Sequence, residues 1–108
     1  MCIRDRIYCG SLPKRDAAYH QGTAWGFLMG GFLTAYMKVH HHSPEAKKQA
    51  MAYLAPVQTH LLEEGCIGSI SEIFDGDAPH TCRGCYAQAW SVGEILRCYT
   101  QDIQKNQK

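Results

Sequence analysis

Residues 68–85, GSISEIFDGDAPHTCRGC, combine several side chains that can do chemistry. They include three carboxylates, a histidine, an arginine and two cysteines: Glu72, Asp75, Asp77, His80, Arg83, Cys82 and Cys85. Carboxyl groups can act as general acids or bases, and a Cys-x-x-Cys pair can hold zinc or undergo redox chemistry. Long polar loops of this kind commonly carry function. The stretch therefore predicts a metal site, a redox site or one wall of a catalytic pocket.

Among the three carboxylates, Glu72 has the most apolar surroundings in the sequence, between Ile70, Ile73 and Phe74. A carboxyl group in such a setting is a candidate for catalysis. A solvated acidic loop or a set of helix caps would explain the same residues. The alternating spacing of oxygen ligands in an EF-hand is missing, which disfavours calcium.

Cys82 and Cys85 have the spacing of a zinc or redox pair, but the sequence has no second Cys/His pair placed as in a zinc finger or ribbon. His80, Cys66 and Cys98 could add ligands, although their spacings match no motif. A thioredoxin-like pair needs a strand-to-helix junction, and no strand is predicted here. Reduced, half-buried thiols are the simpler interpretation. A small helical module that binds a metal or another ligand through Cys82, Cys85 and nearby histidines remains the alternative.

Two further segments contain histidine. Residues 40–42, HHH, come directly before a helix cap, which predicts a solvated turn rather than a metal-binding tract. In residues 19–25, YHQGTAW, an aromatic residue, His20 and a glycine lead into an apolar segment. Aromatic rings can stack on the apolar faces of sugars, and His20 could donate hydrogen bonds to hydroxyl groups. The residue pattern alone favours a structural role for His20 over a binding role.

Three helices are predicted to position these side chains. The first covers about residues 23–40, and its apolar stripe consists of Trp25, Leu28, Phe32, Ala35, Tyr36 and Val39. Glycines at 26, 30 and 31 each cost this helix about 1 kcal/mol relative to alanine. A helix that tolerates them is expected to pack closely against a neighbour.

The second helix is predicted over residues 44–64, with Ser43 as its N-cap. Pro56 should kink this helix or mark a boundary just before it, and Gly65 should end it in a left-handed conformation. The apolar stripe consists of Ala50, Leu54, Val57 and Leu61.

The third helix is predicted over about residues 87–103, and without a predicted strand the fold class is all-α. A chain of 108 residues is at most one small domain. Its net charge of +1 gives no electrostatic footprint for nucleic acid or an anionic membrane. The sequence has neither an apolar run long enough to span a bilayer nor a signal-peptide pattern. Both observations predict a cytoplasmic protein with reduced thiols.

The first six residues, MCIRDR, look foreign to the rest of the sequence. A codon series that encodes them resembles a transposon-end adapter used in sequencing libraries. We therefore expect residues 1–6 to be an artefact and the gene to begin upstream. Without Arg4, Asp5 and Arg6, nine basic and nine acidic residues remain and the net charge is zero.

Two segments carry a resemblance to a known family. YHQGTAW and GSISEIFDGDAPHTCRGCYAQAWSVGEILR resemble the C-terminal amylo-α-1,6-glucosidase domain of the glycogen debranching enzyme family. The resemblance extends over about residues 19–99. Cys82 stands where the family commonly has proline, which weakens the case for a preserved site at Cys82 and Cys85.

The resemblance implies a fold and an activity. Residues 7–108 would be the C-terminal part of a glucosidase domain and would form the terminal helices of an (α/α)₆ toroid, similar to glucoamylase-like hydrolases and incomplete in this chain. The domain would hydrolyse α-1,6-linked glucose at branch points of glycogen or limit dextrin with inversion, without a cofactor or metal. The missing N-terminal part of the domain would carry the general acid and cover exposed apolar helix faces, so this chain alone is expected to be inactive.

The resemblance also implies roles for residues. Glu72 matches the family's general base. Asp75 and Asp77 lie too close together for an opposed acid–base pair, so they are assigned to loop rigidity or to glucose hydroxyls. Arg83 could bind a sugar hydroxyl or hold a carboxylate. The residues expected at the substrate are Tyr19, His20, Trp25, Asp75, His80 and Arg83.

Overall fold

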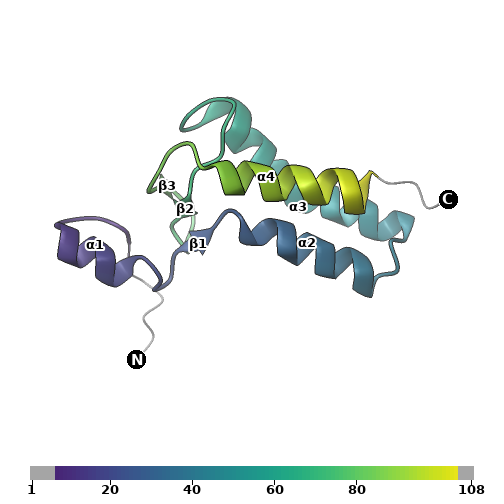
Figure 1. The fold of residues 1–108 in the computed structure, drawn as a ribbon, viewed down its shortest axis with the longest axis horizontal. Helices are drawn as coiled ribbons and strands as arrows, with labels where there is room; N and C mark the ends of the chain where they lie inside the picture. The colour runs from purple at the N-terminus through teal and green to yellow at the C-terminus, as the bar shows by residue number, and fades with distance from the viewer. Residues whose placement is uncertain (1–6, 105–108) are drawn as a thin grey trace.

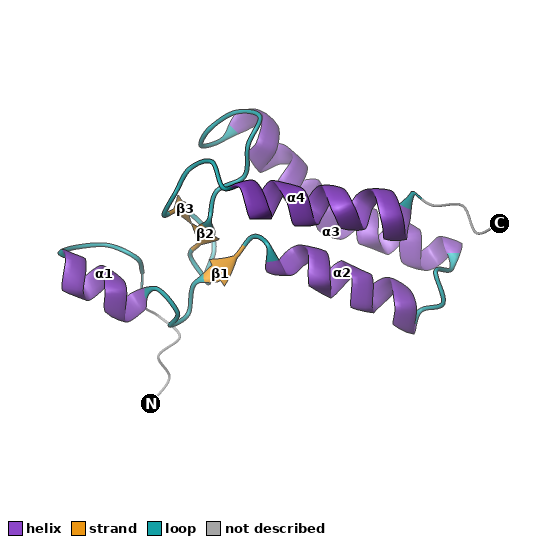
Figure 2. Cartoon of the chain, in the orientation of Figure 1, coloured by secondary structure: helices purple, strands orange, loops and turns teal. Residues whose placement is uncertain are grey.

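The computed structural model describes residues 7–104. Within them the chain is helix-rich, with a small sheet beside three longer helices (Figures 1 and 2). The elements are α1 (Leu12–Ala18), β1 (Ala24–Trp25), α2 (Leu28–Val39), α3 (Pro44–Glu63), β2 (Ile73–Phe74), β3 (Cys82–Arg83), α4 (Ala89–Cys98) and a π-helical turn, η1 (Tyr99–Ile103).

The core lies between α2, α3 and the continuous segment of α4 and η1, which run alongside one another in Figure 1. Leu33 and Met37 of α2 and Ala50 of α3 are completely buried in it, as is Cys98 of α4. The core is narrow because two of its positions on α3, Ala46 and Ala50, are alanines. Small side chains at these positions let the helices approach closely.

Helix α2 buries a different face from the one that the sequence predicted. Leu28, Phe32 and Val39 are 56%, 48% and 71% exposed, whereas the buried side chains are those of Leu33 and Met37. The helix is apolar on two sides, so the periodicity alone could not select the face that packs in this chain. Of the predicted stripe, Tyr36 packs against the core, whereas the face with Leu28, Phe32, Ala35 and Val39 remains exposed.

Helix α3 agrees well with its prediction. The hydroxyl of Ser43 accepts a hydrogen bond from the backbone N–H of Ala46 (3.1 Å), which confirms the N-cap. Gly65 has a φ of +55°, as expected for a left-handed stop. The alternative of a boundary before Pro56 is wrong, because the helix continues through Pro56 to Glu63.

The all-α expectation needs a correction, because a three-stranded antiparallel sheet with the order β1-β2-β3 is present. Ala24 pairs with Phe74, and Phe74 pairs in turn with Cys82. Residues 24–25, expected at the start of the first helix, form β1, and α2 begins only at Leu28. The cause is a distant partner: the backbone of this segment pairs with β2, and the N–H of Gly26 donates to the carbonyl of Glu72 (3.2 Å). Helix α1 was not predicted.

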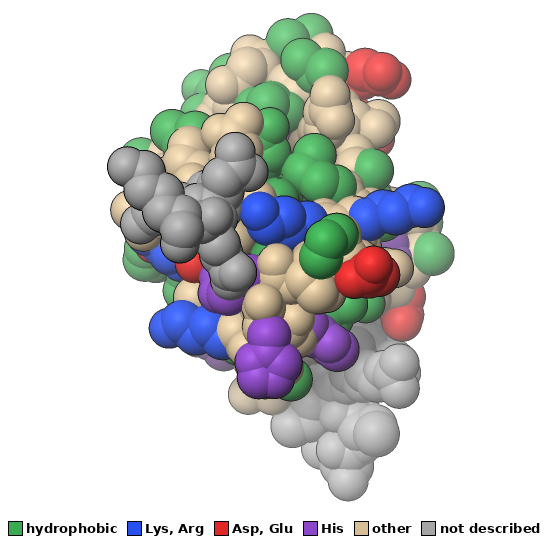
Figure 3. Space-filling model, turned by 90° about the vertical axis from the view of Figure 1, so that its right-hand side faces the viewer, with side chains coloured by type: hydrophobic (Ala, Val, Ile, Leu, Met, Phe, Trp, Pro, Cys, Tyr) green, Lys and Arg blue, Asp and Glu red, His purple; other side chains and the backbone are tan. Residues whose placement is uncertain are grey.

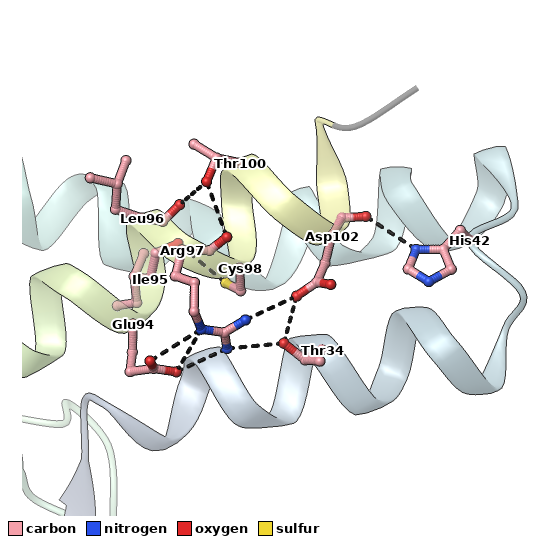
Figure 4. Close-up of polar contacts among 9 residues, drawn as sticks. All are labelled: Thr34, His42, Glu94, Ile95, Leu96, Arg97, Cys98, Thr100 and Asp102. Atoms are coloured by element: carbon pink, nitrogen blue, oxygen red, sulfur yellow. Dashed lines mark hydrogen bonds and ion pairs between the residues drawn. The ribbon is translucent and has the colours of Figure 1, made fainter. Parts of the chain in front are cut away.

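A polar cluster ties α2 to the last helical turns (Figure 4). Arg97 donates to Glu94 (2.9 Å) and to the hydroxyl of Thr34 (3.1 Å), and its guanidinium is 3.4 Å from Asp102. Thr34 donates in turn to Asp102 Oδ2 (2.6 Å). Because these groups satisfy one another across three elements, α2, α4 and η1, the cluster fixes the register of η1 against α2.

The histidines at 40–42 form the turn between α2 and α3. His40 and His41 are exposed, as a solvated turn requires, while His42 Nδ1 donates to the carbonyl of Asp102 (3.2 Å). Figure 3 looks at this end of the molecule and shows histidine side chains on the surface close to lysines and arginines. The predicted artefact at residues 1–6 lies outside the described residues. Across residues 7–104, each helix is too short or too polar to cross a lipid bilayer.

Candidate functional site

The carboxylate of Glu72 is held by one hydrogen bond on each oxygen. The hydroxyl of Tyr19 donates to Oε1, and the backbone N–H of Cys85 donates to Oε2 (3.0 Å). The backbone of Glu72 is fixed as well, because its N–H donates to the carbonyl of Cys85 (2.8 Å). Two hydrogen bonds on the carboxylate and one on the backbone thus fix the position of this half-buried residue.

Gly84 makes this close approach possible. Its φ is +71°, and a Cβ built on it would lie 2.6 Å from Glu72 Oε2 and 3.1 Å from Ile73 Cγ1. A side chain at position 84 would displace the carboxylate from its place beside the backbone. The role of Gly84 was not predicted, although its position directly before Cys85 in the Cys82–Cys85 pair could have indicated it.

Tyr19 remains protonated over a wide pH range. Its hydrogen bond to Glu72, together with burial, raises the pKa of Tyr19 to about 12. A phenol with this pKa is a permanent donor at neutral pH. The hydrogen bond from Tyr19 to the candidate base is a direct contact that the sequence did not indicate.

Aromatic rings extend from Tyr19 along one side of the sheet. His20 and Trp25 are stacked, with ring centroids 5.1 Å apart and an interplanar angle of 5°. Tyr19 meets Trp25 edge-on at 4.7 Å, and Trp90 of α4 lies 6.2 Å from Trp25. The structure thus brings Tyr19, His20 and Trp25 together, and Tyr19 links this aromatic cluster to Glu72.

Asp75 and Arg83 are paired with each other. Arg83 Nε donates to Asp75 Oδ1 (2.6 Å) and Nη2 donates to Oδ2 (2.8 Å) across strands β2 and β3. These hydrogen bonds raise the pKa of Arg83 above its ordinary value. The bidentate pair joins the two arms of the loop, and Arg83 also lines the polar hollow that contains Glu72.

Two hollows flank the sheet. The polar one, about 550 Å³, is lined by Glu72, Arg83, Cys9, Cys82 and Cys85 together with their neighbours. The other, about 710 Å³, is an apolar groove between α2 and α3 whose lining includes Trp25, Phe32 and His80. His80 reaches this groove while its Nδ1 donates to the carbonyl of Asp75 (3.0 Å). Glu72 and His80 therefore face different hollows.

A buried histidine that the sequence analysis missed lies below the loop. His60 of α3 is 5% exposed, and its Nε2 accepts a hydrogen bond from the backbone N–H of Ser71 (3.2 Å), the residue before Glu72. Its position three residues after Val57, on the apolar side of the helix, was a signal in the sequence.

The cysteines carry free thiols at positions 9, 66, 82, 85 and 98. Among the residues that the structure describes, His, Cys, Asp and Glu side chains form no group of three or more that could hold a metal ion. Cys85 instead contributes its backbone to the Glu72 site, and its Sγ donates to the carbonyl of Ala87 (3.4 Å).

Comparison with known proteins adds one finding. A family model described as amylo-alpha-1,6-glucosidase matches residues 5–97. Neither the curated proteins nor the solved structures contain a match to the chain. The matched range includes Tyr19, the loop of Glu72 and helix α4 up to Arg97.

Proposed function

Because this chain belongs to the amylo-alpha-1,6-glucosidase family, the C-terminal domain of glycogen debranching enzymes, we propose that it carries the general base for hydrolysis of α-1,6-linked glucose at glycogen branch points. The observation that carries this proposal is the carboxylate of Glu72, fixed between the Tyr19 hydroxyl and the Cys85 amide. The substrate would be a branched α-glucan, glycogen or limit dextrin.

In the proposed reaction Glu72 takes a proton from a water that attacks the anomeric carbon from the face opposite the leaving oxygen. The glycosidic bond breaks as the general acid gives a proton to the leaving oxygen. Inversion at that carbon follows from attack by water on the opposite face. Tyr19 and Cys85 both donate to the carboxylate, so they hold its two oxygens in a fixed orientation toward the water. Each oxygen keeps a lone pair that could receive the water.

The general acid is proposed to lie elsewhere in the complete enzyme. Inverting enzymes hold their two carboxyl groups roughly 6.5–9.5 Å apart so that a water fits between them. Asp75 is unsuited to this role because it is already bound to Arg83 on both oxygens. This chain would then be inactive alone.

The substrate contacts are also proposals. The stacked rings of His20 and Trp25, linked to Glu72 through Tyr19, would form a platform for a glucose ring. Asp75, His80 and Arg83 would shape the loop, and Arg83, which lines the Glu72 hollow, would reach a hydroxyl there. The bidentate Asp75–Arg83 pair supports the interpretation that Arg83 holds a carboxylate.

The toroid is proposed as the architecture of the complete domain. Exposed apolar side chains on α2, α3 and α4 support it, because they are the faces against which further helices would pack. The alternative, a self-contained helical module that binds a metal or another ligand, predicts a small closed core, and the exposed apolar side chains do not support it.

Free thiols support a reducing compartment such as the cytoplasm.

The test is the substitution Glu72→Gln in the complete enzyme, assayed as glucose release from a branched dextrin. Removing a general base should lower kcat by about 10²- to 10⁴-fold while binding and folding are kept. Glu63→Gln, at an exposed position of α3, is the matched control and should leave kcat unchanged. Turnover of Glu72→Gln within about twofold of the parent would reject the assignment.

A further inference from the structure

We propose that His60 is a positioning residue for the candidate base, and that it acts as the neutral imidazole with its proton on Nδ1. It touches neither Glu72 nor the hollow in front of it. It holds instead the backbone amide of Ser71, which directly precedes Glu72. The inference rests on the proposed function of Glu72.

The hydrogen bonds of the ring define its protonation. The backbone N–H of Ser71 can only donate, so His60 Nε2, at 3.2 Å, must present its lone pair. The proton then resides on Nδ1, which lies 3.0 Å from Glu64 Oε2 and donates to that carboxylate. An imidazolium ring has no lone pair and cannot make the bond to Ser71. The arrangement thus specifies one tautomer of one charge state.

Burial makes this bond important for the loop. Ser71 is 1% exposed and His60 is 5% exposed, so water cannot readily replace either partner. A buried amide N–H without an acceptor is unfavourable, so the backbone at Ser71 would shift to find another partner. Strand β2, which begins at Ile73, would shift with it.

Neighbouring residues also restrict the ring itself. Phe74 meets His60 edge-on at 4.9 Å with an interplanar angle of 79°. A Cβ on Gly65 would lie 3.3 Å from His60 Cε1, so a glycine at this position leaves the ring its full space. Through His60, helix α3 therefore fixes the orientation of the Ser71 backbone. Glu72 lies in the chain between Ser71 and the first residue of β2, Ile73.

The experiment compares three variants of the complete enzyme in glucose release. His60→Leu fills the space without an acceptor, whereas His60→Gln places an amide oxygen near the position of Nε2. We expect His60→Leu to lower kcat by about 10- to 100-fold with KM little changed, because a small displacement of a catalytic group is costly. His60→Gln should recover most of the loss.

His42→Leu is the control, because it also removes a histidine bond to a backbone group, the Asp102 carbonyl, at the far end of α2. Each kcat is divided by the concentration of folded enzyme, so a loss of stability alone would not lower it. Equal kcat values for His60→Leu and the parent would overturn the proposal, as would equal losses in His60→Leu and His60→Gln.

A second measurement does not depend on activity. In protein labelled with ¹⁵N-histidine, the His60 signals are identified by their loss in His60→Gln. We expect the pattern of a protonated Nδ1 and an unprotonated Nε2, and the opposite tautomer would overturn the proposal. If this pattern is present but Glu72→Gln is fully active, the proposed function fails while the histidine arrangement stands. If Glu72→Gln is inactive and His60→Leu is not, only the present inference fails.

Discussion

Glu72 differs from Asp75 and Glu94 in the charge of its partners. Asp75 is paired with Arg83, and Glu94 is paired with Arg97. Glu72 accepts from a phenol and a backbone amide, both neutral. A carboxylate held by neutral donors keeps its negative charge available to a water, whereas one bound to arginine is largely neutralised. This contrast separates Glu72 from Asp75 more clearly than sequence could.

The hydrogen bond from Tyr19 leads to a prediction about pH and stability. Tyr19 has a pKa of about 12 in the folded chain and an ordinary value of about 10 when unfolded. The folded state therefore holds this proton more tightly, and the bond contributes its full stability below about pH 10. That contribution is lost as the pH rises through about 12.

Urea unfolding of the parent and Tyr19→Phe at about pH 8 and about pH 11 measures this effect. At the lower pH we expect the parent to have a larger free energy of unfolding than Tyr19→Phe. At the higher pH the difference between the two proteins should shrink. A difference that grows with pH would contradict the assignment of the bond.

At the scale of elements, two adjacent glycines of α2 should respond in opposite ways to alanine. A Cβ on Gly30 would lie 2.7 Å from the carbonyl oxygen of Glu94 in α4, which is the predicted close approach. Gly31 has nothing within 4 Å of its Cβ position. We expect Gly30→Ala to destabilise the chain by about 1–3 kcal/mol through overpacking.

Gly31→Ala should instead stabilise it by about 0.5–1 kcal/mol through helix propensity alone. Thermal unfolding followed by circular dichroism distinguishes the two. Equal effects of both substitutions would mean that α2 and α4 are not in close contact.

Local signals in the sequence predicted some elements and missed others. The N-cap at Ser43 and the stop at Gly65 were readable because each depends on its immediate neighbours. Each strand contains only two residues, which is too short for any periodic pattern, and β1 forms only by pairing with β2 far along the chain. The segment before α2 therefore looked helical.

The site was predictable to a similar extent. Glu72 was predicted from its apolar neighbours and from the family resemblance. The partners of the loop were not readable, because Asp75 meets Arg83 across a strand pair and Ser71 meets His60 from another element. Such contacts depend on the tertiary fold rather than on spacing.

The whole molecule is extended rather than compact. Its radius of gyration is 15.2 Å, whereas about 13 Å is typical for a compact domain of this length. Leu96 of α4 is 58% exposed, and Leu28 and Phe32 of α2 are also exposed. Such a surface favours association with other apolar surfaces.

We therefore expect the chain on its own to self-associate as its concentration rises. Sedimentation velocity over a range of concentrations should show this, and Leu96→Gln should weaken it. Gln58→Leu, at an exposed position of α3, is the reciprocal change and should strengthen it. A chain that stays monomeric at every concentration would contradict the expectation.

The position of the two tryptophans has an optical consequence. Trp25 and Trp90 are the only tryptophans of the sequence, and they lie 6.2 Å apart beside the Glu72 end of the sheet. The tryptophan fluorescence of this protein therefore originates at the end of the molecule that contains the sheet. It reports on the sheet and the start of α4, and it is insensitive to the distant turn between α2 and α3. A change in emission can be read as a local event at the candidate site.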